Sequence, residues 1–509
     1  MTNKKSEKLA GFSLLTVVLA FGLFACSGGG GGNSTPSVSL NGISLNETAL
    51  TLVGGTSEQL VVTFDPIDAT NKNVTWASDN ESAVEVSPEG IITAVGCANG
   101  DTAKITATSE DGGWIADCDV TISVKNVKTM RFAPKIVGCD IYNKKLGVKL
   151  EPIFTPADPT YKTGTWTSSN ESIATVDENG QVKFADSSVL WDEVEITLET
   201  YDGKKTDTCR VMLYEPPEIE TVKDENGNDT GFVKIGPCNM PLGENASYRV
   251  TLTQAYEVSD HEVTQKEWED VMGNKPSIFN GTQGKEAADG EVQENRPVEN
   301  VSWFMAIAYC NKLSIKENRK PCYKVLVNGA EVDFVNLKLS DIPRAEESDE
   351  EKAKVAEWYA ATCDFMANGY RLPTEAEWEI AALGGLLGKV YSGTAIENDI
   401  GNYVWYSENS GKKTHEVKTK TYNAYGLYDM SGNVWEWCWD WLSSSAPSGE
   451  NPKGPDTSLT SGTNRAKVAR GGAWCHGGFN AETSKRGHAF ARLSNDYIGF
   501  RVVRSAPNP

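Results

Sequence analysis

The sequence predicts a multidomain chain in which two all-β sandwich domains precede a larger α+β domain. Its 509 residues are too many for one hydrophobic core, because domains usually hold about 100 to 200 residues. A segment near the N-terminus recurs once, 90 positions further along the chain. From residue 232 onward the composition changes, because tryptophans crowd together and helical periodicity appears.

The charge balance narrows the class of partner. The chain has 70 acidic and 48 basic residues and a formal net charge of −22. Phosphate binding needs clustered Lys and Arg, so this balance argues against a nucleic-acid partner. Hydrophobic residues make up 39% of the chain, which is enough to build cores and excludes wholesale disorder.

Residues 1–25 have the pattern of a signal peptide that ends in a lipobox. Three lysines lie within the first eight residues, residues 9–24 are mostly apolar, and Leu-Phe-Ala precedes Cys26. The pattern predicts cleavage before Cys26 and lipidation of this residue. The glycine-rich residues 26–36 then form a flexible tether.

This N-terminus predicts attachment to the cell envelope through a lipid. Ser27 rather than aspartate follows the cysteine. By resemblance to the sorting rules of bacteria with two membranes, this favours the outer membrane. We therefore expect a lipid-anchored protein that is exposed at the cell surface.

Two repeats follow the tether. Residues 61–96 match residues 151–186 without a gap, and each copy contains the motif W-x-S-x-N-E-S followed by a glycine turn. Short runs of Thr, Val and Ile alternate with polar residues between Gly, Asn and Asp, as strands do. The motif resembles bacterial Ig-like domains of group 2, a family of spacers and adhesin modules. The resemblance implies Ig-like sandwiches at residues 37–125 and 126–215, with the tryptophan as a core residue.

The cysteines are compatible with disulfides, because an exported chain meets an oxidising compartment. Cys97 and Cys118 lie in the first repeat, and Cys139 and Cys209 bracket the second. The economical expectation is one bridge per repeat, although sequence alone does not fix the pairing. The six other cysteines after Cys26 belong to the C-terminal domain.

Residues 216–231 are rich in Pro, Glu, Asp and Asn and are expected to be a linker to a domain at residues 232–509. Helical periodicity appears at residues 263–272, 302–314 and 374–383.

Capping residues support two of these helices. Thr264 and Thr374 have the character of N-caps, and Glu377 completes a capping box with Thr374. The acidic residues 331–351 are expected to be a surface insertion.

The C-terminal domain carries six motifs in series. They are EVTQ at 262–265, PVENVSW at 297–303, YRLPTEAEWE at 370–379, YGLYDMSGNVWEW at 425–437, RGGAW at 470–474 and IGFR at 498–501. This series resembles the formylglycine-generating-enzyme, or sulfatase-modifying-factor, branch of the C-type lectin fold. The resemblance implies an α+β domain of that type over residues 232–504, but it does not establish an activity.

Most motif residues are expected to be scaffold. Large aromatic rings supply buried area to a domain with little regular strand pattern. The expected core rings are Trp303, Trp378, Trp435 and Trp437, and the expected buried polar ties are Arg371, Glu377 and Glu436.

The resemblance maps a Ca²⁺ site onto one of these motifs. Asp429 and Glu436 would supply carboxylates, and Gly432 and Val434 would supply main-chain carbonyl oxygens, which are the ligands that Ca²⁺ prefers. The alternative is that the aspartate caps a turn and the glutamate forms a salt bridge.

The family's oxidases use two cysteines in a C-x-x-x-x-C arrangement that holds copper. Cys475 occupies the first position, and Asn480 stands at the second. A single thiol does not form a two-sulfur site, so no copper is expected. Cys475 would be catalytic only under the alternative in which the chain is an active oxidase of this family.

Residues 470–503 combine the recognisable residues of two motifs with intervening positions whose side chains have no common chemistry. We call the motif residues the frame. This segment resembles the variable region of diversity-generating retroelement proteins, among which are variable lipoproteins of the same domain type. In those systems, mutation at template adenines does not produce Glu, Gln, Lys, Met or Trp, so Glu482 and Lys485 belong to the frame. The exchangeable set is Cys475, His476, Gly477, Gly478, Phe479, Asn480, His488, Ala489, Leu493, Ser494, Asp496 and Tyr497.

The mixture of apolar, aromatic and polar groups is typical of a binding surface. We expect a non-catalytic, monomeric receptor for an extracellular protein or glycan. The alternatives are an active oxidase of the family and a purely structural envelope lipoprotein. The expected ligand-binding residues are Trp474, Cys475, His476, Phe479, His488, Leu493, Asp496 and Tyr497.

Overall fold

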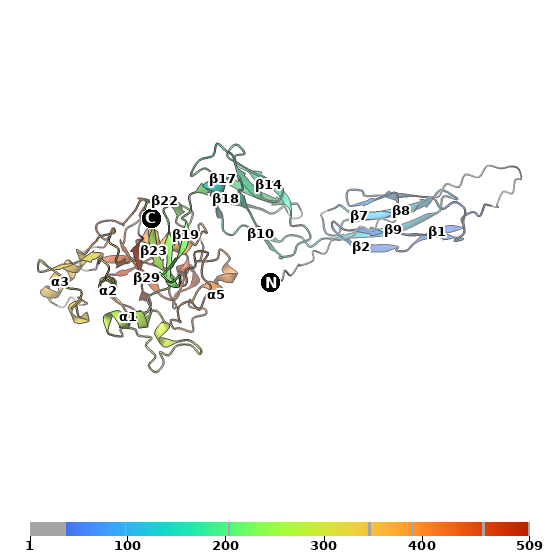
Figure 1. Ribbon diagram of the computed structural model, residues 1–509. Helices are drawn as coiled ribbons and strands as arrows, with labels where there is room; N and C mark the ends of the chain where they lie inside the picture. Colours follow the sequence, from blue (N-terminus) through green and yellow to red (C-terminus); the bar gives the residue numbers. More distant parts are fainter. Residues whose placement is uncertain are drawn as a thin grey trace. The chain divides into compact units, whose positions relative to one another are not determined.

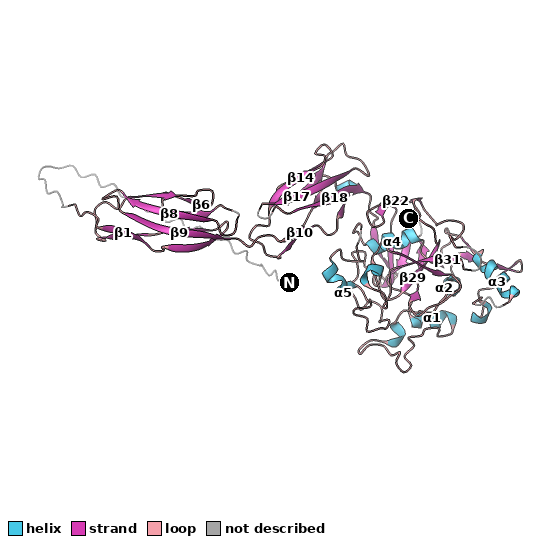
Figure 2. Ribbon diagram, turned by 180° about the vertical axis from the view of Figure 1, so that it is seen from behind, coloured by secondary structure: helices cyan, strands magenta, loops and turns pink. Residues whose placement is uncertain are grey.

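The computed structural model describes residues 37–96, 98–201, 204–344, 348–388, 390–460 and 464–506 (Figures 1 and 2). The expected signal peptide, lipidation site and tether, together with Cys97, lie outside these residues. The chain divides into two compact units, one of which contains the first repeat up to Ser123 and the other the chain from Val124 onward. In the part of the chain that the structure describes, no helix is long and apolar enough to cross a bilayer.

The first repeat is an all-β domain. Its largest sheet has the order β2-β9-β8-β5, in which β2 and β9 run parallel. Alternate residues of β8 and β9 are buried, as the two-residue period of a strand with one core face requires. The strands are β1 (Gly42–Leu45), β2 (Ala49–Val53), β3 (Ser57–Gln59), β4 (Val62–Asp65), β5 (Val74–Ser78), β6 (Val84–Val86), β7 (Ile91–Ala94), β8 (Thr102–Ser109) and β9 (Ile115–Ser123).

The second repeat has the same topology, which confirms the internal duplication. Its largest sheet has the order β11-β18-β17-β14, again with a parallel first pair. The strands are β10 (Thr129–Arg131), β11 (Ile136–Asp140), β12 (Val148–Lys149), β13 (Ile153–Thr155), β14 (Gly164–Ser168), β15 (Ala174–Val176), β16 (Gln181–Phe184), β17 (Glu193–Thr200) and β18 (Thr206–Tyr214).

Close packing explains why a tryptophan and a glycine recur together in both repeats. Gly90 has a φ of 84°, and a Cβ atom there would lie 2.5 Å from the Trp76 ring. At Gly180 the corresponding distance to Trp166 is 2.7 Å. The turn therefore needs glycine both for its backbone angle and for the approach of the ring. Trp166 is half-buried and packs against the core of its domain.

The expected disulfide of the second repeat is wrong. Cys139 on β11 and Cys209 on β18 are buried free thiols. The two strands are parallel, and Cys139 lies opposite Leu213, four residues beyond Cys209. At about 3.3 Å per residue, the two cysteine Cα atoms are displaced by about 13 Å along the strands, whereas the Cα atoms of a disulfide lie less than about 7 Å apart. Cys118 is a buried free thiol as well, and its expected partner lies outside the described residues.

The C-terminal domain contains three larger sheets, of orders β19-β20-β23-β34-β28, β32-β31-β29-β33 and β21-β22-β30. Figure 1 shows strands β23 and β29 in the middle part of this domain, with helices on several sides of them. The strands are β19 (Ile219–Lys223), β20 (Asp229–Ile235), β21 (Cys238–Leu242), β22 (Tyr248–Leu252), β23 (Tyr256–Ser259), β24 (Tyr323–Lys324), β25 (Leu326–Val327), β26 (Ala330–Glu331), β27 (Thr362–Cys363), β28 (Tyr370–Arg371), β29 (Trp435–Trp441), β30 (Gly449–Glu450), β31 (Ala466–Arg470), β32 (Arg486–Phe490), β33 (Ile498–Gly499) and β34 (Val503–Ser505).

The segment 216–231 differs from the expected linker. It contains β19 and the beginning of β20, which pair as an antiparallel hairpin of the five-stranded sheet. The Asp224 carboxylate accepts hydrogen bonds from the backbone N–H groups of Asn226 and Asn228. The polar residues that indicated a linker therefore form the turn of a hairpin.

The three expected helices are confirmed, each within two residues of its expected ends. Thr264 and Thr374 are N-caps, and both form capping boxes, with Glu267 and Glu377 respectively. The acidic insertion contains the start of a helix that its weak pattern did not predict. The helices are α1 (Gln265–Met272), α2 (Trp303–Lys316), α3 (Asp349–Tyr359), α4 (Glu375–Leu383) and α5 (Ile400–Tyr403).

Candidate ligand-binding face

The frame of the candidate face starts from a buried ion network at the end of β31. Arg470 is fully buried, contacts Glu375 and Glu379, and donates a 2.6 Å hydrogen bond to the carbonyl of Lys485. Arg486 on β32 makes two further hydrogen bonds to Glu375, of 2.6 and 2.9 Å. These bonds hold both ends of the segment 470–486 on the N-terminal turn of α4.

A glycine lets the segment fold back on itself. Gly472 has a φ of 79°, and a Cβ atom there would lie 2.8 Å from the carbonyl oxygen of Asn480 and 2.9 Å from Ala481. Any other residue would be strained and would push the loop 475–480 away. The second glycine of the motif is therefore required by this close approach.

Four aromatic or thiol side chains meet in front of this frame. The sulfur of Cys475 lies 3.3 Å from Nδ1 of His476. The His476 ring packs edge-on against Tyr497, with 5.3 Å between ring centroids, and against Trp435, with 5.9 Å. The cluster therefore joins residues from the loop after β31, the segment before β33 and the start of β29.

Trp474 fixes this cluster to the domain. Its indole Nε1 donates a 3.0 Å hydrogen bond to the carbonyl of Asp496. Its ring packs edge-on against Phe279 at 5.1 Å, and both Trp474 and Tyr497 pack against the main hydrophobic core. The base of the face is thus rigid, whereas Cys475 is exposed.

The remaining expected residues lie on the same segment at separate exposed positions. Phe479, 55% exposed, belongs to a short 3-10 helix, and the Lys485 ammonium lies 3.8 Å from its ring centroid. His488 is exposed on β32 opposite Val468. Leu493, 37% exposed, lies in the turn after that strand. The expected frame residue Glu482 is buried.

Sequence reasoning missed two residues that support the face. Phe279 lies in an irregular segment with no periodicity, and nothing in the sequence indicates its contact with Trp474. Asn300 has a φ of 62°, accepts a hydrogen bond from Ser494 and donates its backbone N–H to the carbonyl of Asn495. The signal that could have identified Asn300 is its place in a recognised motif, since asparagine tolerates a left-handed backbone.

The protonation states of Cys475 and His476 determine whether the cluster can act as a nucleophile or bind a metal. Cys475 is exposed, but protein surrounds part of its thiol group, and this partial burial together with the Asp496 carboxylate raises the pKa of the thiol to about 11. Burial lowers the pKa of His476, so its imidazole is neutral at pH 7. A neutral imidazole does not stabilise a thiolate, which is the nucleophilic and metal-binding form of cysteine. The side chain of Asn480 donates only a long 3.5 Å hydrogen bond to the carbonyl of Gly477.

The predicted Ca²⁺ ligands surround a buried cluster of charges. Both carboxylate oxygens of Glu436 accept hydrogen bonds from Arg501, at 2.7 and 2.8 Å, and one also accepts from Nε1 of Trp378 at 2.7 Å. One oxygen of Asp429 accepts from the backbone of Lys418, and the other has no partner. Burial raises the pKa of Asp429 to about 6.

This arrangement does not fit the predicted Ca²⁺ ligand set. The orphaned oxygen of Asp429 is suited to a cation, but the Glu436 carboxylate is committed to Arg501. Among the described residues, no three or more His, Cys, Asp or Glu side chains are arranged to hold a metal ion. Ca²⁺ binding stays a prediction, and the observed bonds favour the salt-bridge alternative for Glu436.

Comparison with known families agrees with the domain order. Residues 215–506, more than half of the chain, match the family described as sulfatase-modifying factor enzyme 1-like domain. Residues 39–120 and 126–191 match the bacterial Ig-like domain of group 2.

Individual relatives carry different names. The chain is 37% identical over 297 residues to a protein named chaperone protein LppX from Paenibacillus barcinonensis. The aligned region covers 55% of this chain and 90% of that protein. It is 35% identical to the formylglycine-generating enzyme of Streptomyces coelicolor, over 29% of this chain and 51% of the enzyme.

Among solved structures, variable protein 1 of Treponema denticola is 41% identical, with 57% of this chain and 100% of that chain covered and a TM-score of 0.49. Because the family match covers more than half of the chain, the chain belongs to the family of proteins with a sulfatase-modifying factor enzyme 1-like domain, which here follows Ig-like domains of group 2.

Proposed function

We propose that the chain is a surface lipoprotein that binds extracellular ligands without catalysis, through the face that residues 474–497 form. Cys26 would carry the lipid anchor, in the outer membrane, and the Ig-like domains would act as spacers. The ligand would be a protein or a glycan, and the protein would act as a monomer.

One observation carries this proposal: exposure and burial alternate sharply within the segment. Cys475, Phe479, His488 and Leu493 are exposed, whereas Arg470, Glu375 and Glu379 are buried and bonded to one another. Exposed substitutions usually change stability by less than about 0.5 kcal/mol. Such a segment can change its recognition chemistry without losing its fold.

The relatives support a binding role in two ways. One of them is named a variable protein, which suits a face whose exposed positions are exchangeable. Another is named a chaperone, which suits a polypeptide ligand. Tyr497 packs against His476, which in turn packs against the buried Trp435, and tyrosine is enriched at the centre of protein interfaces.

The thiol chemistry argues against the oxidase alternative. Cys475 supplies a single thiol, and its pKa is raised to about 11. Asn480 offers an amide where the oxidases place a second sulfur. Neither group provides the thiolate pair that would hold copper.

Oxygen consumption separates the two functions. We expect the wild-type protein, supplied with Cu⁺ and a sulfatase-type cysteine peptide, to consume no oxygen above the rate of a Cys475→Ser variant. The variant is the matched control, because it replaces the exposed thiol by a hydroxyl of similar size. Peptide oxidation that depends on Cys475 would place the oxidase function first.

A further inference from the structure

Two adjoining cavities of the C-terminal domain form a single groove that contains none of the candidate face residues. Their volumes are about 130 and 370 Å³. They share five lining residues, which come from the loop before β23, the loop after β27 and β34. The shared residues are Gln254, Ala255, Phe365, Met366 and Ser505.

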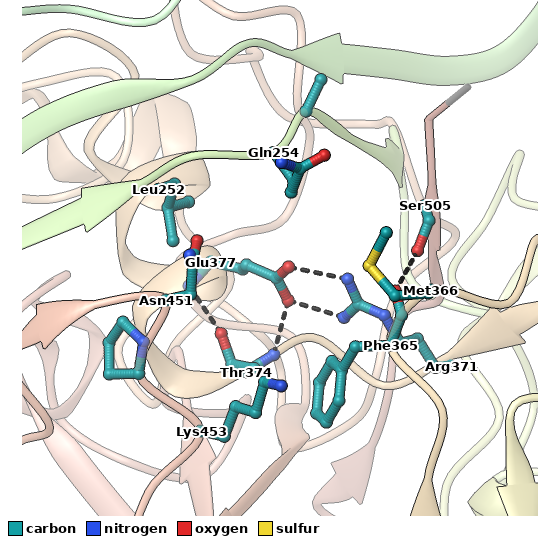
Figure 3. A pocket seen from close by; sticks show the side chains of 12 residues that line it. Leu252, Gln254, Phe365, Met366, Arg371, Thr374, Glu377, Asn451, Lys453 and Ser505 are labelled. Atoms are coloured by element: carbon teal, nitrogen blue, oxygen red, sulfur yellow. Dashed lines mark hydrogen bonds and ion pairs between the residues drawn. The ribbon is translucent and has the colours of Figure 1, made fainter. Parts of the chain in front are cut away.

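The floor of the groove is a neutral ion pair. Arg371 donates two hydrogen bonds of 2.7 Å to the carboxylate of Glu377 (Figure 3). Both side chains are at most 10% exposed. Arg504 and Glu257, which line the larger cavity, form a second ion pair, whose charges also cancel. Nε of Arg371 is buried without a hydrogen-bond partner, so the floor keeps one unused donor.

Apolar groups stand open above this floor. Met366 is 75% exposed, and Phe365 is half-buried beside it. Leu252 and Pro452 complete the apolar lining of the smaller cavity. Figure 3 shows Leu252, Met366 and Phe365 around the central ion pair. Covering these groups would contribute about 25 cal/mol per Å² of apolar area.

The surplus charge at the groove is positive. The Lys453 ammonium lies 4.4 Å from the Phe365 ring centroid, and the described residues give it no carboxylate partner. Arg319, which lines the larger cavity, lies 3.4 Å from the carboxylate of the partly exposed Glu317. It also donates a long 3.4 Å hydrogen bond to the carbonyl of Asn368 and lies 5.5 Å from the Tyr370 ring centroid. Positive surplus is unexpected in a chain with a net charge of −22, so it marks a local preference for anions.

Gln254 lines both cavities, and the described residues give its side-chain amide no hydrogen-bond partner. The groove thus combines an unpaired ammonium, a hydrogen-bonding amide and an apolar wall. Small-molecule sites have this composition: mostly apolar lining with a few polar groups that fix orientation.

We propose that this groove binds a small organic carboxylate with an apolar body. The carboxylate pairs with Lys453, and the body covers Phe365 and Met366. The site is separate from the candidate face, so it would operate whether or not that face binds a macromolecule.

Isothermal titration calorimetry with the full chain tests the proposal. The probes are N-acetyl-L-phenylalanine and its neutral amide, which differ only in the charge of the head group. We expect the carboxylate to bind about tenfold more tightly than the amide, since a charged hydrogen bond contributes more than a neutral one. Lys453→Met keeps the aliphatic stem and should reduce affinity for the carboxylate about tenfold.

Two further variants complete the design. Lys453→Arg should retain the preference for the carboxylate, and Lys352→Met, at an exposed lysine that does not line the groove, should bind as the wild type does. Equal affinity for the two probes, no binding of either at millimolar concentration, or unchanged affinity in Lys453→Met would each overturn the proposal.

Discussion

Replacing Arg501 with leucine should destabilise the C-terminal domain by about 3 to 5 kcal/mol, the usual cost of removing one partner of a buried ion pair. Arg501 and Glu436 are both fully buried. The guanidinium also donates to the carbonyls of Ser259, at 3.0 Å, and Tyr428, at 2.8 Å. Its loss would leave Glu436 uncompensated, with Glu262 and Asp429 close by. Chemical denaturation with urea measures the change.

Two control variants distinguish charge from packing. Adding Glu436→Gln to Arg501→Leu removes the unpaired charge, and the amide oxygen can still accept from Trp378, so part of the stability should return. Arg344→Leu, at an exposed arginine, should change stability by less than about 0.5 kcal/mol. A loss below about 1 kcal/mol in Arg501→Leu would contradict the ion-pair account.

The ion pair of Arg501 and Glu436 also determines the effect that we expect Ca²⁺ to have on the melting temperature. An ion that binds only the folded state raises the melting temperature by mass action. Because Arg501 occupies both oxygens of Glu436, we expect no rise when Ca²⁺ is added to metal-stripped protein. A rise would restore the ligand set of Asp429, Gly432, Val434 and Glu436.

Stability should fall by about 3 kcal/mol between pH 6.5 and 9 because of His261. Burial alone would lower the pKa of His261, but hydrogen bonds to Asp260 and Glu267 outweigh it and raise the pKa to about 9. A raised histidine pKa gives stability that is complete below the unfolded value of about 6.5 and is lost as the pH rises through 9. The shift of about 2.5 units, at about 1.4 kcal/mol per unit, gives the magnitude.

Denaturation at several pH values in His261→Gln tests this expectation. Glu299 and Asp440 also have raised pKa values, of about 7 and 8. The stability of the wild type and of His261→Gln therefore also changes with pH because of these two groups. The difference between wild type and variant isolates the histidine. His488→Gln, at an exposed histidine, should keep the wild-type slope. Identical pH profiles for wild type and His261→Gln would contradict the bonded-histidine account.

Local signals predicted much of the fold. The helices after Thr264 and Thr374 begin where a hydroxyl caps the first turn, and such a cap is visible within four residues of sequence. The duplication of the Ig-like domain could be predicted from the recurrence of a single motif. In contrast, β19 was hidden because its hairpin turn, centred on Asp224 to Asn228, has the composition of a linker.

Contacts between residues far apart in the chain could not be predicted from the sequence. Glu436 and Arg501 are 65 positions apart, and each motif permitted several partners. The register of β11 and β18, which separates Cys139 from Cys209, depends on a parallel pairing that cysteine spacing does not reveal. Lys467 is fully buried, 3.7 Å from the Trp441 ring centroid, although a lone lysine in a strand predicts exposure.

The candidate site was predicted in part. Sequence located the segment 470–503 and its exposed side chains, because the frame of glycines and arginines is recognisable. It did not predict that His476, Tyr497 and Trp435 meet while Phe479, His488 and Leu493 stand apart. That division depends on how the segment folds back at Gly472, which is a tertiary property.

The most direct test of the proposed function is a display library of the chain with positions 475, 476, 479, 488, 493, 496 and 497 randomised, selected against hen egg-white lysozyme as a defined protein target. A matched library randomises the buried positions 371, 377, 436, 470 and 501. The account predicts that the first library yields folded binders with melting temperatures within a few degrees of the wild type, and that the second loses cooperative unfolding. Unfolded members throughout the first library, or no binder at micromolar target, would contradict a binding face on a rigid frame.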